Sequence, residues 1–181
     1  MIEPVITIGK KTVIAMVHLP ALPGSPDYDT ELGMSKILDA VMSDLEALQS
    51  GGVDAVMFGN EFDRPYVLKA PPEGLAALAA IIGQVKPMVK VPFGVNYLWD
   101  PVATVALAVA TEANFAREIY TGLYASDMGL WSPDCAGSAR LRSSNGRHDL
   151  QMLFNINAEF ATSLDDRPLD IKAKSAVFSS K

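Results

Sequence analysis

The chain has 181 residues, of which 49% are hydrophobic, so it is long enough to bury one core and is expected to form a single domain over residues 1–181. Its net charge of −6 and its scattered Lys and Arg residues argue against a nucleic-acid partner and against a polybasic membrane tether. Its apolar stretches are too short to span a bilayer, residues 1–10 do not resemble a signal peptide, and the single cysteine cannot form an intrachain disulfide, which together predict a soluble, cytoplasmic protein.

Strand-like and helix-like segments alternate along the first half of the chain. Thr12 to His18 is β-branched and apolar, as a strand buried on both faces would be. A proline-rich loop follows, and then apolar residues recur at helical spacing before a glycine pair: Ile37, Val41, Leu45 and Leu48, then Gly51 and Gly52. The pattern repeats with a strand over Val53 to Gly59 and a helix between Pro72 and Pro87.

The second half continues the alternation less regularly. Val89 to Asn96 is predicted as the third strand, in which Pro92 indicates a bulge or an irregular edge. Asp100 is expected to cap a short helix that begins at Pro101 and turns three valines to one side. The remaining elements are predicted in this order: a strand over Asn114 to Ile119, a long loop from Tyr120 to about Ser138, a strand over Gln151 to Ile156, and a helix from Pro168 to about Phe178.

Strands that alternate with helices predict a parallel sheet with right-handed crossovers. Periodicity alone leaves both a doubly wound sheet and a (β/α)8 barrel open. In either fold the carboxyl ends of the strands open onto one face, where ligands bind. The polar residues that follow the strands are therefore the candidate site residues.

His18 and Glu61 are the expected catalytic residues, because an imidazole and a carboxylate at neighbouring strand ends can exchange protons with a substrate. Asn60, Glu61 and Asp63 together can also hold a divalent cation or divide acid and base roles. The alternative is purely structural. In that interpretation His18 holds the proline-rich loop by a hydrogen bond, Glu61 caps a turn, and Asp63 forms an exposed pair with Arg64.

Five residues are expected to bind the ligand, namely Asn60, Asn96, Arg117, Asp127 and Asn155. Asn96 offers both a donor and an acceptor to a sugar hydroxyl. Arg117 lies inside a strand and needs an anionic partner, such as Glu61, Glu118 or a ligand phosphate or carboxylate. If it points outward between helices, a salt bridge explains it instead. Asp127 lies on the long loop, which is either a lid or disordered.

Several kinds of site are not predicted. No glycine-rich phosphate loop stands after a strand, and one cysteine with two distant histidines cannot build a zinc site. No residue is therefore assigned as a metal ligand, whether a divalent metal is used is left open, and the residues leave any cofactor undetermined. The expected partner is a small polar molecule, and a homo-oligomer is left open.

Five segments of the chain resemble the BtpA/SgcQ family, and the resemblance extends from Thr12 to Ser179. They are HLPALPGSP at 18–26, DAVMFGNEFDRPY at 54–66, FGVNYLWD at 93–100, FAREIYTGLYASDMGLW at 115–131 and LFNINAEFA at 153–161. The proline-rich loop and the stretch after the fourth strand are the most specific of these. The chain resembles the SgcQ side of the family more closely than the BtpA side.

The resemblance implies a TIM barrel of the ribulose-phosphate-binding type. Because the family pattern continues past Ser179, we expect a truncated barrel of about five βα units that lacks the last three. The phosphate site often found after strands seven and eight of such barrels would then be missing.

No established reaction comes with the family, so whether the chain is an enzyme is left open. We expect it to bind a small polar metabolite, a sugar or nucleoside phosphate, at the strand ends. The alternatives are a non-catalytic assembly or biogenesis factor, as for the photosystem I-related BtpA proteins, and a truncated, inactive remnant.

Overall fold

The structure is a computed structural model that describes Val5 and residues 11–180. The segment 1–10, for which no signal peptide is expected, lies outside the described residues apart from Val5. In the part of the chain that is described, no helix is both long enough and apolar enough to cross a membrane.

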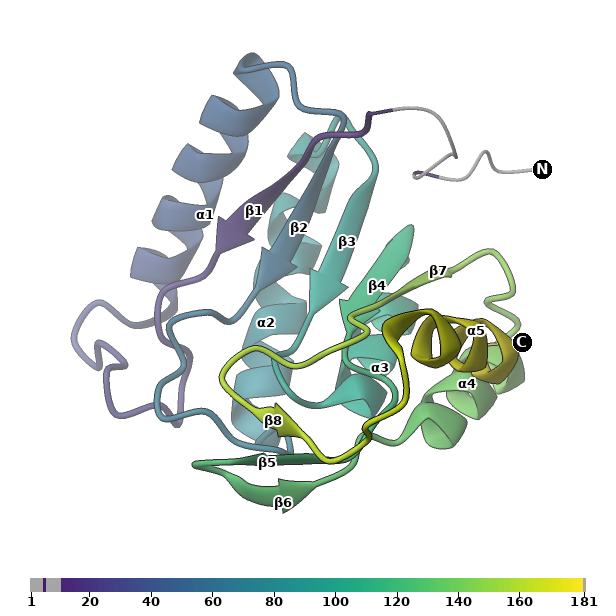
Figure 1. Ribbon diagram of the computed structural model, residues 1–181. Helices are drawn as coiled ribbons and strands as arrows, with labels where there is room; N and C mark the ends of the chain where they lie inside the picture. The colour runs from purple at the N-terminus through teal and green to yellow at the C-terminus, as the bar shows by residue number, and fades with distance from the viewer. Residues whose placement is uncertain (1–4, 6–10, 181) are drawn as a thin grey trace.

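The main sheet consists of five parallel strands whose order in space is their order along the chain, β1-β2-β3-β4-β7 (Figure 1). The strands are β1 (Ile14–His18), β2 (Ala55–Gly59), β3 (Phe93–Asn96), β4 (Phe115–Glu118) and β7 (Gln151–Phe154). A doubly wound sheet reverses its strand order at a switch point, whereas a barrel wall adds each new strand to the same edge. The sheet follows the barrel pattern, which confirms the predicted fold class with about five βα units.

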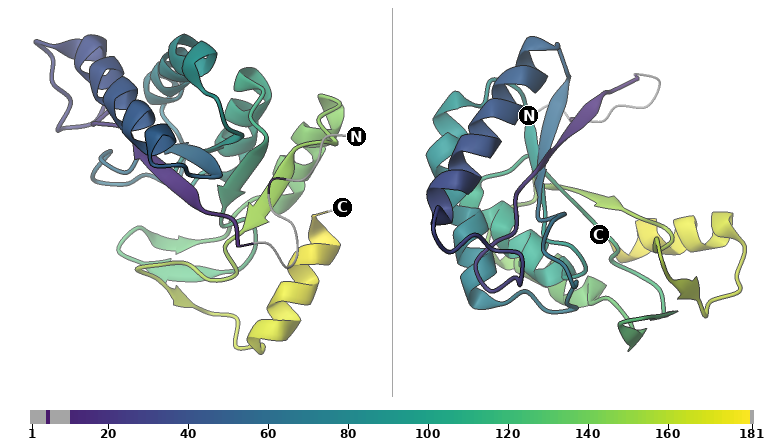
Figure 2. Two further views of the ribbon diagram at one scale, coloured as in Figure 1. Left: turned by 90° about the horizontal axis from the view of Figure 1, so that it is seen from above. Right: turned by 90° about the vertical axis from the view of Figure 1, so that its left-hand side faces the viewer.

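Four helices line the outer face of this sheet (Figure 2): α1 (Gly33–Ser50), α2 (Pro72–Val85), α3 (Pro101–Thr111) and α4 (Cys135–Ser144). A short 3-10 turn, η1 (Lys86–Met88), follows α2. Helix α1 ends before Gly51 and buries the first three residues of its predicted stripe, whereas Leu48 is half-buried. Helix α3 packs between α2 and α4 and therefore buries Thr104, Leu107 and Ala108 in addition to one predicted valine, Val105.

The third strand is shorter than predicted. It begins at Phe93, directly after Pro92, rather than at Val89. It also lies in the middle of the sheet and not at an irregular edge. Pro92 still contributes to the sheet, because its carbonyl oxygen accepts a hydrogen bond from the N–H of Val56 at 3.1 Å. Proline lacks the N–H that a central strand needs, so the ladder starts one residue later.

The prediction of one long loop from Tyr120 to Ser138 is wrong. The segment forms an antiparallel hairpin of β5 (Tyr124–Ser126) and β6 (Gly129–Trp131), and it ends in the first turn of α4. Strand β8 (Thr162–Ser163) joins β5, so that a second sheet has the order β6-β5-β8. Strands this short show no readable alternation in the sequence. The hairpin is held by tertiary packing, since Tyr124 and Trp131 share a core cluster with Trp99.

The last helix, α5 (Leu169–Ser179), confirms the helix predicted near the end of the chain. Figure 2 shows it on the other side of the main sheet from α1 and α2. Its buried residue is Ala176, whereas Val177 and Phe178 are 63% and 82% exposed. Helix α5 therefore carries an apolar surface that the described residues leave open to solvent.

Candidate functional site

The carboxyl ends of the five parallel strands meet at one edge of the sheet. The register aligns His18 with Gly59, and Gly59 with Asn96. The side-chain amide of Asn96 donates a hydrogen bond to the main-chain oxygen of Arg117 at 2.7 Å, and Arg117 is aligned with Leu153 on β7. The strand ends thus form one row, at the place where barrel proteins bind their ligands.

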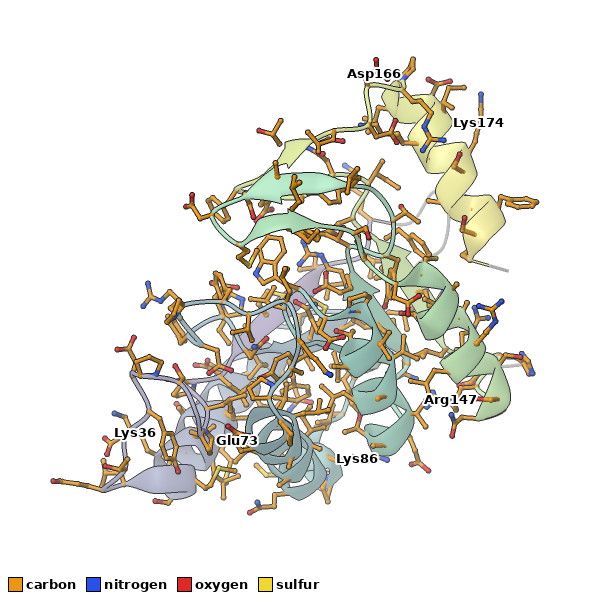
Figure 3. The ribbon with its side chains drawn as sticks, turned by 90° about the horizontal axis from the view of Figure 1, so that it is seen from below. Lys36, Glu73, Lys86, Arg147, Asp166 and Lys174 are labelled. Carbon is orange, nitrogen blue, oxygen red and sulfur yellow. The ribbon has the colours of Figure 1, made fainter. Side chains whose placement is uncertain are left out.

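A narrow cleft at this edge brings four of the predicted site residues together. It has a volume of about 60 Å³ and is lined by Glu61, Asn96, Arg117, Asn155 and by Leu98, Trp99, Glu118, Ile119 and Glu159. Figure 3 views the molecule from the side toward which the strand arrows of Figure 1 point. None of the charged residues labelled there lines the cleft.

Arg117 is the cation of the cleft. Its Nε donates a hydrogen bond to Oδ1 of Asn155 at 3.0 Å, so an amide holds the side chain rather than one of the carboxylates suggested by the sequence. Among the described residues, its two terminal nitrogens have no hydrogen-bond partner. A guanidinium held through Nε in this way keeps the four N–H groups of its two terminal nitrogens available for a ligand oxygen.

Glu118 is the buried acid of the cleft, with only 3% of its surface exposed. Oε1 accepts a hydrogen bond from the N–H of Trp99 at 2.5 Å, and Oε2 accepts one from the N–H of Ile119. Burial raises the pKa of Glu118 to about 7, although these two hydrogen bonds, one from Asn96 and the charge of Arg117 act to lower it. A carboxyl with such a pKa can both give and take a proton at neutral pH.

Glu61 enters the cleft from the loop after β2 and is held by Tyr66. The Tyr66 hydroxyl donates to the main-chain oxygen of Glu61 at 2.9 Å and lies 3.3 Å from its carboxylate Oε1. Burial and the nearby Glu61 charge raise the pKa of Tyr66, which keeps the phenol protonated as a donor. Glu61 is therefore positioned by a side chain, and not as the cap of a turn.

Asn60 and Asp63 support the site and do not line the cleft. The side chain of Asn60, which is 3% exposed, accepts from the N–H of Leu98 at 2.7 Å and donates to Asp63 at 3.2 Å. Asp63 also accepts from the N–H of Leu22 at 2.6 Å. Burial raises the pKa of Asp63 despite these bonds. The residue that holds the proline-rich loop is thus Asp63, and the structural alternative in which Asp63 forms an exposed pair with Arg64 is wrong.

His18 and Asp127 are not among the residues that line the cleft. The His18 ring is half-buried and meets the Phe62 ring edge-on, with 6.3 Å between centroids. Asp127 is exposed in the turn between β5 and β6, where it lines a neighbouring groove. Within the described residues, no three His, Cys, Asp or Glu side chains are grouped to hold a metal ion.

Two functional candidates escaped the sequence analysis, Glu118 as a site residue in its own right and Trp99. Glu118 carried a usable signal, because two charged residues in succession inside an apolar strand place one charge on each face. Trp99 carried none. Its position depends on a backbone φ of +72° in the loop after β3. A positive φ is rare for a bulky residue, so the sequence gives no reason to predict it at a tryptophan.

Known proteins resemble the chain in sequence. The sequence pattern of the BtpA family matches residues 9–181. The chain is 52% identical over 169 residues to the sgc region protein SgcQ of Escherichia coli K12, an alignment that covers 93% of this chain and 63% of SgcQ. It is 32% identical over 121 residues to the Photosystem I biogenesis protein BtpA of Synechocystis sp. PCC 6803, which covers 65% of this chain and 42% of that protein. The chain thus spans less than two thirds of each relative.

Solved structures resemble it in fold. The crystal structure of 7,8-dihydropteroate synthase from Vibrio fischeri ES114 matches 97% of this chain with 58% of its own length, at a TM-score of 0.62 and 11% sequence identity. At that identity the likeness shows the fold alone, and it agrees with the barrel pattern of the strand order. Because the family pattern covers nearly all residues and SgcQ shares half of them, the chain belongs to the BtpA family.

Proposed function

We propose that the cleft binds a hydroxyl-bearing part of a small polar metabolite and that Glu118 exchanges a proton with it. The observation that carries this proposal is the buried Glu118, whose pKa is raised to about 7 at the carboxyl ends of parallel strands. Ionisable groups with pKa values near the working pH are the ones suited to general acid–base catalysis. The proposed ligand is a soluble metabolite, in keeping with the cytoplasmic location expected from the sequence.

The composition of the cleft favours a hydroxyl group over a phosphate. Glu61, Glu118 and Glu159 place three carboxyl groups around one guanidinium, that of Arg117. A doubly charged phosphate would be repelled by these carboxylates, whereas a hydroxyl donates to a carboxylate and accepts from Arg117. The moiety we propose for the cleft is therefore the neutral part of a sugar or a nucleoside, with any phosphate lying outside it.

The reaction we propose is a proton transfer, with a division of roles among the predicted residues. Glu118 is the acid or base, Arg117 and Asn155 bind the oxygen next to the reacting atom, and Glu61 orients a second hydroxyl. His18 stands at the end of β1 in the same row of strand ends, and we propose it as a second base. Each role is inferred from the position of the residue and can be tested by substituting that residue.

Binding of a panel of pentoses, hexoses and nucleosides, measured by thermal shift and calorimetry, tests the proposal. We expect Glu61→Gln and Asn155→Ala to weaken binding of the active compound by about tenfold each, which corresponds to the loss of one hydrogen bond to a charged group. Glu46→Gln, on the exposed side of α1, is the matched control. A panel without any binder, or variants that bind like the wild type, would remove the proposal.

Turnover is tested separately once a binder is found. Glu118→Gln keeps an acceptor for one backbone N–H but cannot exchange a proton, so we expect binding to persist and turnover to be lost. His18→Ala is compared with His148→Ala, since His148 is exposed and does not line the cleft. Equal turnover in His18→Ala and the wild type would exclude the second base while leaving Glu118 in place.

A second candidate function is a non-catalytic assembly factor. It is suggested by the name of the Synechocystis relative, a Photosystem I biogenesis protein, and the observation that favours it is the exposed apolar surface of α5, with Val177 and Phe178. It predicts that Val177→Ser with Phe178→Ser changes the association of the protein with others, and that the metabolite panel has no binder. A binder that depends on Glu61 would exclude it as the main function.

A further inference from the structure

A second depression, larger than the cleft, lies on the other side of Trp99. This aromatic groove has a volume of about 620 Å³, and its walls include Arg64, Tyr66, Trp99, Asp127, Met128 and Phe160. Trp99 lines both the groove and the cleft. Tyr66 also lines the groove, and its hydroxyl hydrogen-bonds Glu61 of the cleft. The two depressions are therefore neighbours joined by two aromatic side chains.

The fold holds two aromatic residues of this groove on an unfavourable backbone. Among the described residues, three non-glycine residues have positive φ, namely Trp99 at +72°, Glu112 at +59° and Phe160 at +56°. Glu112 ends α3 in the usual left-handed cap. The other two are bulky aromatic residues, for which this conformation is a genuine outlier. Outliers of this kind concentrate at ligand sites, and here both line one groove.

The surroundings of the two residues differ in a way that suits a binding site. Trp99 is only 8% exposed and is fixed by Trp131, whose ring lies edge-on at 5.5 Å between centroids. Its indole N–H is buried and has no hydrogen-bond partner in the described part of the chain. Phe160 is 88% exposed at the rim. The strained Trp99, with its unpaired indole N–H, and the exposed phenyl ring of Phe160 do not improve the stability of the free protein. We therefore attribute both features to contact with a ligand.

The chemistry of the groove indicates a flat ring with polar edges. Tyr66, Trp99 and Phe160 offer aromatic faces, on which heteroaromatic rings stack. Asp127 and Arg64, both exposed, supply acceptors and donors at the rim. Nucleobases combine a stacking face with donors and acceptors on one edge. From this combination we infer that the aromatic groove binds a nucleobase, and that the hydroxyl-bearing part in the cleft is the ribose of the same nucleoside. Only the second half of this inference rests on the proposed function.

Intrinsic fluorescence offers a direct test, because the chain has two tryptophans and both belong to this region. The 181-residue chain is titrated with adenosine, guanosine, cytidine and uridine, with their free bases, and with ribose, and calorimetry confirms each affinity. We expect at least one base to bind and to change the fluorescence, and its nucleoside to bind more tightly. Ribose alone should change the fluorescence less than the base or the nucleoside does, since it contacts Trp99 only from the side of the cleft.

Two exposed phenylalanines provide a matched pair of variants. Phe160→Ser removes a stacking face and should weaken the base by about tenfold, whereas Phe178→Ser on α5 should not change its affinity. Tyr66→Phe keeps the ring and releases Glu61, so it should weaken the nucleoside but not the base. If no base binds, or if Phe160→Ser binds the base like the wild type, the groove is not a nucleobase site. If a base binds but its nucleoside binds no more tightly, the groove assignment stands and the proposed role of the cleft fails.

Discussion

The main-chain N–H of Trp99 donates a hydrogen bond to Oε1 of Glu118, 2.5 Å away. This bond connects the loop after β3 to the end of β4. Glu118 is the buried acid of the cleft, and Trp99 is the wall that the cleft shares with the aromatic groove. The strained backbone and the raised pKa thus lie at the two ends of one hydrogen bond. A ligand ring that binds in the aromatic groove and shifts Trp99 would change the hydrogen bonding of the Glu118 carboxyl, and hence its acidity.

The ionisation of Glu118 makes the stability of the protein depend on pH. Its pKa is about 7 in the folded state and near the ordinary 4.5 in the unfolded state. Between these values the folded state binds more protons, so the group favours folding at low pH and this contribution is lost as the pH rises through 7. We expect Glu118→Gln to gain roughly 3 kcal/mol relative to the wild type as the pH rises from about 4 to about 8.

Urea unfolding of both proteins at several pH values measures this difference. Glu46→Gln, which changes an exposed glutamate on α1, corrects for the effect of removing one negative charge. The prediction concerns the slope and not the absolute stability, because glutamine supplies one acceptor where the carboxylate supplies two. Parallel curves for the wild type and Glu118→Gln would show that Glu118 titrates alike in both states.

Asp63 should determine the order of the proline-rich loop. Its Oδ1 accepts from the N–H of Leu22, a residue with 0% exposure, so Asp63→Ala leaves a buried donor without a partner. We expect a loss of about 1–3 kcal/mol in the free energy of unfolding and faster hydrogen exchange at the Leu22 amide. Asp27→Ala, in an exposed position of the same loop, should change neither. Unchanged exchange at Leu22 in Asp63→Ala would mean that the prolines alone order the loop.

Much of the barrel wall could be predicted because buried parallel strands are continuous apolar runs. The strand that ends at His18 and helix α1 were predicted from β-branched residues and from the i, i+4 stripe through Val41. The β5–β6 hairpin could not be predicted, because its three-residue strands have no pattern of their own. They depend on the packing of Trp131 against Trp99, two segments that are distant in sequence.

The sequence predicts which residues meet at the candidate site, because the order of parallel strands decides which positions come to the same edge of the sheet. Glu61, Asn96 and Asn155 follow or end a strand, Arg117 is the last residue but one of β4, and parallel strands bring such positions to one edge. What topology does not decide is which partner each side chain takes. Arg117 was expected to meet an anion and is held by an amide, since the register places Asn155 within reach of Nε.

The cap of α3 should matter more than the cap of α4. Asp100 accepts from the N–H of Ala103 and from the N–H of Ala70, each at 2.9 Å, so it caps the helix and ties down the loop before α2. Asp134 accepts one bond, from Gly137 at 2.7 Å, at an exposed position. We expect Asp134→Ala to cost about 1 kcal/mol and Asp100→Ala about twice as much. Equal losses in urea unfolding would show that the bond to Ala70 adds nothing.

Two glycine-to-alanine substitutions should have opposite effects on stability. A Cβ at Gly94 on β3 would overlap the ring of Phe115, a fully buried residue that packs in a cluster with Ala55 and Met57, whereas a Cβ at Gly83 on α2 would meet nothing within 4 Å. We expect Gly94→Ala to lose about 3 kcal/mol or to fail to fold, because an overpacked core has no room to relax. Gly83→Ala should gain about 0.5–1 kcal/mol, because alanine is the better helix former at an exposed position.

A double-mutant cycle shows whether Gly94→Ala loses stability because its Cβ meets Phe115 or because the β3 backbone itself needs glycine. Phe115→Leu removes the ring atoms that the new Cβ would meet, so Gly94→Ala should cost less in that background than in the wild type. Thermal and urea unfolding of the four proteins of this cycle measure the coupling between the two positions. If Gly94→Ala costs the same in both backgrounds, the glycine is needed for the β3 backbone itself and not for the approach of Phe115.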